Sequence, residues 1–273
     1  LLAQQLTKDL GQNVIVENKG GAGGTIAAEF VAQSPADGYT IMLASGSMLT
    51  VNPNLYKKLP VNYSKDFVNI TNVASGPMLL SVSTKLPVKN LNEFITYAKT
   101  KDLNFGSAGI GSQVHMAGEN LIYSANIPAT HVPYKGESAA INDLVAGQID
   151  FMVGNLTAAA GFAKTGQIKP IAVTSAKRVK QLPDTPTVAE SGIPGFESTG
   201  WFGLVAPAST PKAITDKIYD ATVKAVNSEA MKKSLELNGL SPVVNSQKEF
   251  DAQIKAELAN WEKVIKGRNI SAQ

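Results

Sequence analysis

Hydrophobic residues along the chain fall into short β-branched runs, separated by stretches with helical spacing. The runs predict strands at residues 13–18, 39–45, 78–83, 103–107, 129–134, 149–154, 168–175 and 201–207. Helical spacing is found between them in GTIAAEFVAQ, NLNEFITYAK, SQVHMAGENLIYSA, ESAAINDLVAGQ and NLTAAAGFAKTG. This alternation favours an α/β fold of mostly parallel sheets flanked by helices.

The first residues also predict a helix, because Leu2, Leu6 and Leu10 are spaced at i, i+4 and i+8 and Gly11 provides a stop. An α/β chain normally opens with a strand. We therefore expect an upstream strand to precede Leu1, with a secretory signal as a candidate for part of the same segment.

From Thr210 onward the chain is predicted to be almost entirely helical. Thr210 is expected to cap a helix whose first position is Pro211. Ser246 and Glu249 have the spacing of a capping box for the last helix. One face of that helix carries an apolar stripe, predicted to pack in the core, of Phe250, Ile254, Leu258, Trp261 and Ile265.

Composition narrows the class of protein. The 273 residues are 44% hydrophobic and 17% charged, and no apolar run approaches the roughly 18 to 20 residues of a membrane-spanning helix. The net charge of +3 comes from Lys and Arg spread along the chain, which argues against a nucleic-acid partner. Cysteine is absent and only two histidines occur, so we expect neither a thiol nucleophile nor a metal, and no cofactor.

Four segments that follow predicted strands share a composition rich in Gly, Ser and Thr. They are GGAGGT (20–25), SGS (45–47), SAGIGS (107–112) and YKGES (134–138). Glycine lets backbone N–H groups approach a ligand, hydroxyls donate hydrogen bonds, and helix N-termini add partial positive charge. Any one of these segments can be an ordinary turn, but the four together predict a site for an anion, most simply a carboxylate.

The sequence does not match the motifs of nucleotide-binding proteins or of serine hydrolases. GGAGGT and GIGSQV match neither the phosphate loop nor the dinucleotide fingerprint, and no GxSxG elbow is present. Ser209 and Lys212 form SxxK and residues 164–166 read KTG, but their order is reversed from penicillin-binding enzymes. His115 and His131 are interpreted as structural residues, and Trp201 as hinge packing or a wall of the cleft.

Five stretches together resemble the solute-binding receptors of tripartite tricarboxylate transporters, also called the Bug family. They are VIVENKGGAGGTIAAEFVAQSPADGYTIMLAS, NFGSAGIGSQVHMAGENL, HVPYKGESAAINDLVAGQIDFM, KPIAVTSAKRVKQLPDTPTVAESGIPGFE and WFGLVAPASTP. The resemblance implies a type II periplasmic binding protein, with two α/β lobes holding an organic acid between them. It implies a non-enzymatic, monomeric receptor in the periplasm that delivers its ligand to membrane transporter subunits.

The resemblance also assigns site residues. In the first lobe it implies ligand contacts from Gly23, Gly24, Thr25, Ser45 and Ser47. In the second lobe it implies contacts from Ser107, Gly109, Ser112, Tyr134, Gly136 and Asn155. Asn155 is expected to select the distal end of a dicarboxylate or an aromatic acid. Residue 154 is Gly where many relatives have Asp, which leaves no acidic group expected at that position for an ammonium.

The chain is expected to change lobes near Pro77 and Met78 and to return through the Gly- and Pro-rich segment 182–200. Lobe 1 is therefore predicted to comprise residues 1–78 and 199–273, and lobe 2 residues 79–198. The family also usually has an N-terminal strand and loop that form one pocket wall, expected upstream of Leu1. Two alternatives stay open. The protein could be a ligand sensor of the same fold or, less favoured, an enzyme that acts on an organic acid.

Overall fold

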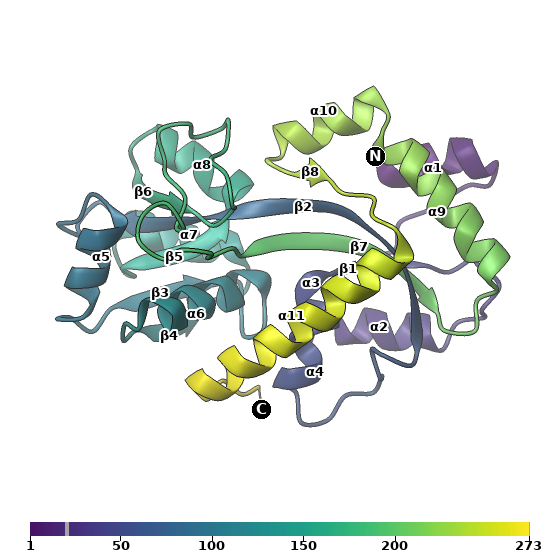
Figure 1. The fold of residues 1–273 in the computed structure, drawn as a ribbon, viewed down its shortest axis with the longest axis horizontal. Coiled ribbons are helices and arrows are strands. Elements are labelled where there is room, and N and C mark those ends of the chain that lie inside the picture. Colours follow the sequence, from purple (N-terminus) through teal and green to yellow (C-terminus); the bar gives the residue numbers. More distant parts are fainter. Residues whose placement is uncertain (20–21, 273) are drawn as a thin grey trace. The chain divides into compact units, whose positions relative to one another are not determined.

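The computed structural model describes residues 1–19 and 22–272, in which strands and helices alternate as the hydrophobic pattern predicts (Figure 1). The chain divides into two compact units. Unit 1 contains Leu1–Ser75, Trp201–Ile265 and Ile270–Gln273, and unit 2 contains Gly76–Gly200 and Lys266–Asn269. The strands β2 (Phe67–Ser83) and β7 (Thr199–Pro207) and the helix α11 (Gln247–Arg268) each contribute residues to both units.

Unit 1 has a mixed set of strands covered by helices. Its other strands are β1 (Met42–Ser45) and β8 (Ser241–Pro242). Its helices, besides most of α11, are α1 (Leu2–Leu10), the short 3-10 helix η1 (Ala22–Gly24), α2 (Thr25–Ala32), α3 (Gly46–Thr50), α4 (Asn52–Leu55), α9 (Lys212–Val226) and α10 (Glu229–Leu237). β7 pairs antiparallel with β1 and lies beside β2, and β8 pairs antiparallel with β2.

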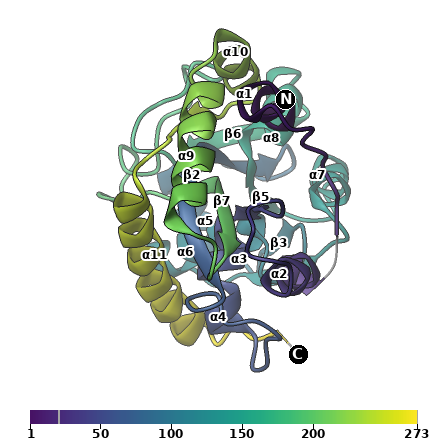
Figure 2. The ribbon, with the colours of Figure 1, turned by 90° about the vertical axis from the view of Figure 1, so that its right-hand side faces the viewer.

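Helices α1 and α9 of unit 1 lie side by side in both views (Figures 1 and 2). Leu6, buried on α1, packs against Ala221 and Ala225 of α9. The Asp9 carboxylate and the Lys224 ammonium lie 2.5 Å apart across the same two helices. The predicted stop is confirmed, because Gly11 ends α1 with φ of 66° and donates its N–H to the Thr7 carbonyl.

Unit 2 has the strand order β4-β3-β5-β2-β6. Its own strands are β3 (Asn104–Ser107), β4 (Thr130–Pro133), β5 (Phe151–Asn155) and β6 (Ile168–Val173). Its helices are α5 (Leu91–Ala98), α6 (Gln113–Ala125), α7 (Glu137–Ala146) and α8 (Leu156–Lys164). β3 is parallel to β4 and β5, whereas β2 is antiparallel to β5 and β6.

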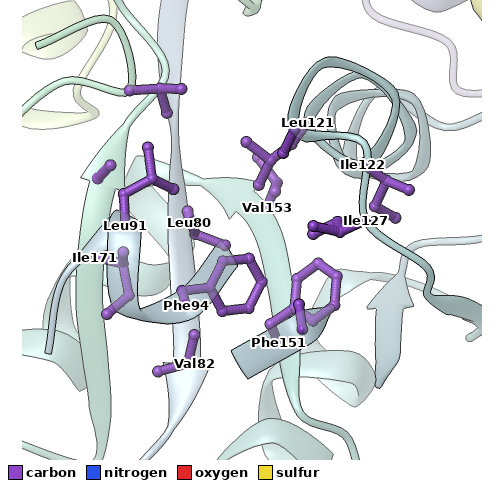
Figure 3. Packing of buried hydrophobic residues seen from close by; sticks show 14 of the residues in the cluster. Leu80, Val82, Leu91, Phe94, Leu121, Ile122, Ile127, Phe151, Val153 and Ile171 are labelled. Atoms are coloured by element: carbon purple, nitrogen blue, oxygen red, sulfur yellow. The ribbon is translucent and has the colours of Figure 1, made fainter. Parts of the chain in front are cut away.

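The core of unit 2 forms where α5 and α6 pack on this sheet (Figure 3). Phe94 of α5 meets Phe151 of β5 edge to face, with ring centroids 5.0 Å apart. Leu121 and Ile122 bring the apolar face of α6 into the same cluster. Burial of these side chains fixes the positions of β5 and α6. Two predicted site residues therefore have fixed positions in unit 2, Asn155 at the end of β5 and Ser112 at the start of α6.

The α/β class is confirmed, but three details of the prediction are wrong. Residues 13–18 form no strand, and Ile15 and Val16 are 79% and 72% exposed, because no described strand runs beside them to supply hydrogen-bond partners. The sheets are mixed rather than mostly parallel, because β2 and β7 pair antiparallel with neighbours distant in sequence. Sequence order gives no information on such pairing.

The third wrong detail concerns element boundaries. β2 is one strand of 17 residues, although only its last six positions had a strand pattern. Residues 46–50 and 52–55 form short helices that the pattern did not predict. The Thr210 cap is displaced by one position, because Pro211 is the N-cap and α9 starts at Lys212. The capping box of α11 is confirmed, with Ser246 Oγ accepting from the Glu249 N–H and Glu249 Oε2 accepting from the Ser246 N–H.

Candidate ligand-binding site

The predicted residues of unit 2 follow the carboxyl ends of three neighbouring parallel strands. Ser107 at the end of β3 is in register with Pro133 at the end of β4. Phe105 of β3 is in register with Phe151 of β5, which ends at Asn155. Because parallel strands end at the same edge of a sheet, their following loops gather there. The fold therefore brings the loop 107–112, the corner at Tyr134 and Gly136, and Asn155 to one edge of unit 2.

The loop 107–112 is tied together by its own hydrogen bonds. The Gly109 N–H donates to Ser107 Oγ at 3.1 Å, and the Ser112 N–H donates to the Gly109 carbonyl at 3.2 Å. Ser112 caps α6, because its Oγ accepts from the His115 N–H at 3.1 Å. Ser107 is fully buried, so its hydroxyl serves the loop in this structure, and its contact with a ligand stays a prediction.

Two imidazoles lie behind this loop. His115 Nδ1 accepts from the Gly111 N–H at 3.1 Å, and His131 Nε2 lies 2.6 Å from Ser107 Oγ. The two rings stack with centroids 3.8 Å apart. Burial, together with the neighbouring His115, lowers the pKa of His131 to about 4. The geometry agrees with the structural roles predicted for both histidines and adds that both bond to the loop.

The other part of this edge holds Tyr134, Gly136 and Asn155. The Tyr134 hydroxyl donates to Asp143 Oδ2 at 2.7 Å; burial and this bond raise the pKa of Tyr134 to about 12. Gly136 has φ of 114°, a conformation that favours glycine, and it precedes Glu137 at the start of α7. The Glu137 carboxylate accepts from both the backbone N–H and the side-chain Nδ2 of Asn155, each at 2.6 Å.

Glu137 corrects the expectation that no acidic group lies at residue 154. A Cβ added to Gly154 would lie 2.7 Å from Glu137 Oε1, so the Glu137 carboxylate occupies the space that a side chain at 154 would need. Burial raises the pKa of Glu137, although both hydrogen bonds from Asn155 act in the opposite direction. Sequence reasoning missed this acid because only the folded chain brings α7 against the end of β5.

In unit 1 the glycine-rich segment packs on α3 and α4. Gly20 and Gly21 lie outside the described residues, while Gly23 and Gly24 have φ of 61° and 88°. The Asn52 side chain donates to the Gly23 carbonyl at 3.0 Å. A Cβ at Gly24 would lie 2.6 Å from Met48 Cε. Asn52 and Met48 therefore join the two predicted segments of this unit, and neither residue had a sequence signal.

Ser45 and Ser47 lie at the start of α3. Their hydroxyl oxygens are 3.1 Å apart, and Ser45 Oγ accepts from the Met48 N–H at 3.4 Å. Gly46 rests against the indole of Trp201, where an added Cβ would lie 2.7 Å from the ring. Trp201 is buried, meets Phe250 edge to face, and donates its Nε1–H to Glu257 at 2.7 Å. Its contacts in unit 1 therefore support core packing behind the Ser45–Ser47 segment.

The hydroxyl of Thr25 is buried. The side chain is at the first position of α2 and is only 6% exposed. Its Oγ1 has no hydrogen-bond partner among the described residues. A buried hydroxyl without a partner costs about 1–3 kcal/mol. Asn72 Oδ1, Ser81 Oγ and Thr210 Oγ1 are in the same state among the described residues, and Thr25 is the one of the four that lies in a predicted ligand segment.

The described residues also bear on two other classes of function. None of their helices is long and apolar enough to cross a bilayer. They also contain no group of three or more His, Cys, Asp or Glu side chains placed to hold a metal ion.

The fold is that of periplasmic solute-binding proteins. The chain superposes with a TM-score of 0.89 on the structure of R. palustris Rpa4515 with adipate, at 33% identity and covering 99% of this chain and 91% of that one. It superposes with a TM-score of 0.85 on MatC from Rhodopseudomonas palustris with bound malate, at 31% identity and covering 97% and 91% of the two chains.

Sequence comparison gives the family. The family model described as the tripartite tricarboxylate transporter family receptor matches residues 1–270. The protein BugT of Bordetella pertussis is 30% identical over 269 residues, which are 97% of this chain and 82% of BugT. The chain therefore belongs to the tripartite tricarboxylate transporter receptor family, and the resemblance found in the sequence is confirmed.

Proposed function

We propose that this protein is a non-enzymatic periplasmic receptor that captures a small organic acid and delivers it to the membrane subunits of a tripartite tricarboxylate transporter. The observation that carries the proposal is the buried hydroxyl of Thr25 in the glycine-rich segment, which has no hydrogen-bond partner in the part of the chain that the structure describes. A ligand carboxylate would accept its hydrogen bond. Family membership supports the receptor class and the choice of membrane partner.

We propose that the protein binds the acid as a monomer, and that the acid contacts residues of both predicted lobes. The proposed contacts in lobe 1, residues 1–78 and 199–273, are Gly23, Gly24, Thr25, Ser45 and Ser47. Those in lobe 2, residues 79–198, are Ser107, Gly109, Ser112, Tyr134, Gly136 and Asn155. Because these groups are N–H donors, hydroxyls and one amide, binding rests on neutral hydrogen-bond donors rather than on cations.

The ligand proposed is a dicarboxylate or an aromatic carboxylate. The related structures that contain adipate and malate support an organic acid of this size. Asn155, held by Glu137, would contact the end of the ligand distant from the first carboxylate. Ligand contacts on both lobes would shift the population toward a closed form, which the transporter would recognise.

The test is calorimetry with a panel of dicarboxylic and aromatic acids, each matched by its primary amide as a control. We expect at least one acid to bind and its amide to bind at least tenfold more weakly. Small-angle scattering at saturating acid should then show a smaller radius of gyration. Binding of acid and amide with equal affinity would contradict carboxylate recognition. Chemical conversion of the acid, monitored by NMR, would contradict a receptor and favour an enzyme.

A further inference from the structure

His115 has a hydrogen-bond pattern that only one form of its imidazole can make. Its Nδ1 accepts from the Gly111 N–H at 3.1 Å, so Nδ1 carries no proton. Its Nε2 lies 3.5 Å from Glu119 Oε1, an acceptor, so Nε2 carries the proton. Protonation of Nδ1 would place two N–H groups against each other at Gly111. The position of the Gly111 amide in the loop 107–112 therefore depends on a neutral, Nε2-protonated His115.

His131 has the corresponding role at the start of the loop. Ser107 Oγ lies 2.6 Å from His131 Nε2, accepts from the Gly109 N–H, and lies 3.2 Å from the Gly109 carbonyl. The hydroxyl has one proton, and giving it to the carbonyl leaves Oγ to accept from both N–H groups. All three bonds form together only when His131 Nε2 is the donor. His131 is therefore also Nε2-protonated.

The surroundings of the two rings disfavour a positive charge on both at once. Their centroids are 3.8 Å apart, and Phe105 packs on His131 at 4.9 Å and on His115 at 6.1 Å. His115 is 2% exposed, so two positive charges at this distance would repel with little screening. Among the described residues, the charged groups that face the pair are Glu119 and, bonded to it at 2.8 Å, Arg268.

Arg268 provides Glu119 with a cationic partner. The guanidinium Nε donates to Glu119 Oε2, so the carboxylate already has a permanent cation as its partner. The lowered pKa of His131, about 4, agrees with a neutral His131. The loop 107–112 is thus supported at Ser107 and at Gly111 by two uncharged imidazoles from β4 and α6.

We propose that His115 and His131 are positioning residues, which hold the ligand loop 107–112 in its binding conformation as a stacked pair of neutral, Nε2-protonated imidazoles. The proposal rests on the proposed function for the role of the loop. Neither histidine touches the ligand in this account. Each acts through a group of the loop, His115 through the Gly111 amide and His131 through the Ser107 hydroxyl.

The first experiment uses the ligand-free protein, so it does not depend on which acid binds. The chain contains only two histidines, so long-range ¹H–¹⁵N spectra report both tautomers with one assignment. At pH 8 we expect both rings to carry their proton on Nε2, and we expect His131 to stay neutral down to pH 5, whereas a free imidazole with a pKa near 6.5 would be charged there. A charged His131 at pH 6, or an Nδ1–H tautomer of either ring, would overturn the proposal.

The second experiment separates hydrogen bonding from packing at His115. His115→Phe keeps a ring that can stack but has no acceptor, whereas His115→Asn places an amide oxygen near the position of Nδ1. We expect the Gly111 amide to exchange with solvent at least tenfold faster in His115→Phe than in the native protein, and His115→Asn to restore most of the protection. Equal protection in His115→Phe and the native protein would show that the ring only packs.

The third measurement is adipate affinity at pH 7 in the same variants, with melting temperatures as a control for folding. Loss of a hydrogen bond that positions the loop is expected to weaken binding roughly tenfold in His115→Phe, and His115→Asn is expected to recover part of that loss. If adipate binds and the two variants match the native affinity, the loop support does not serve binding. If no acid in the panel binds, the proposed function fails, while the exchange and tautomer results still decide whether the histidines position the loop.

Discussion

At the scale of single residues, Thr25 and Gly24 show two different constraints on the start of α2. Thr25 has a buried hydroxyl with no partner among residues 1–19 and 22–272, which costs free energy unless a ligand accepts its hydrogen bond. Gly24 has φ of 88° and packs against Met48, so it tolerates no side chain without strain. The first feature concerns ligand binding and the second concerns folding, and substitutions can measure them separately.

Thr25→Val should separate the stability of the protein from its affinity. Valine has the shape of threonine without the hydroxyl, so the free energy of unfolding should stay equal or rise by up to about 1 kcal/mol. Affinity for the bound acid should fall by about 1–2 kcal/mol, because the ligand loses one donor. Thr100→Val, at an exposed hydroxyl in unit 2, is the control and should leave affinity unchanged. Unchanged affinity in Thr25→Val would remove Thr25 from the site.

Gly24→Ala should be more destabilising than Gly11→Ala. Both glycines have positive φ, which costs alanine about 1 kcal/mol. Of the two, Gly24 alone has a close neighbour, because an added Cβ would clash with the Met48 side chain. Displacing Met48 should add about 1–2 kcal/mol to the loss of stability. Urea unfolding of the two variants measures the difference. Equal losses would mean that Met48 moves aside without cost.

At the scale of elements, Arg268 in the last turn of α11 bonds to two groups of unit 2. Arg268 donates to Glu119 Oε2 on α6 at 2.8 Å and to the Ala129 carbonyl at 3.4 Å. Burial alone would raise the pKa of Glu119, but hydrogen bonds from His115 and Arg268 lower it below its usual range. The carboxylate is nearly buried, so loss of its cation would leave a charge without compensation.

Arg268→Gln should therefore lower the free energy of unfolding by about 2 kcal/mol, since a largely buried pair loses one partner. It should also raise the pKa of Glu119. Arg178→Gln is the matched control, because Arg178 pairs with Glu190 where both side chains are nearly half exposed. We expect no measurable loss there. Comparable unfolding midpoints for the two variants would contradict the buried pairing.

At the scale of the whole molecule, buried titratable groups set the dependence of stability on pH. The pKa of His131 is lowered to about 4 in the folded protein, from a usual value of 6.5. The unfolded chain therefore binds more protons between pH 6.5 and pH 4, and stability falls as the pH falls through this window. The raised pKa values of Glu137 and Glu257, both caused by burial, act in the opposite direction as they protonate.

His131→Gln should flatten this acid-side loss. The amide can still bond to Ser107 but does not titrate, so the free energy of unfolding should fall less between pH 7 and pH 4.5 than in the native protein. Because His131 is partly exposed, the difference should be about 1 kcal/mol after discounting for solvent screening. Urea unfolding at the two pH values measures it. Parallel losses in both proteins would assign the acid dependence to other groups.

Local pattern determined the α/β class, most helices, the Gly11 stop and the capping box at Ser246 and Glu249, because each depends on neighbours within a few positions of the chain. The same pattern grouped the Gly-, Ser- and Thr-rich segments, and family resemblance named the eleven candidate residues, whose ligand contacts stay a prediction.

Only the tertiary structure decided what surrounds those residues. The sequence holds His115 and His131 sixteen positions apart, and the pairing of β4 with β3, together with the packing of α6 against β3, stacks them under one loop. Glu137 meets Asn155 because α7 packs beside the end of β5. The antiparallel pairing of β2, its full length, and the lack of a strand at residues 13–18 were equally beyond local pattern. Strand pairing and burial depend on contacts distant in sequence, which periodicity does not encode.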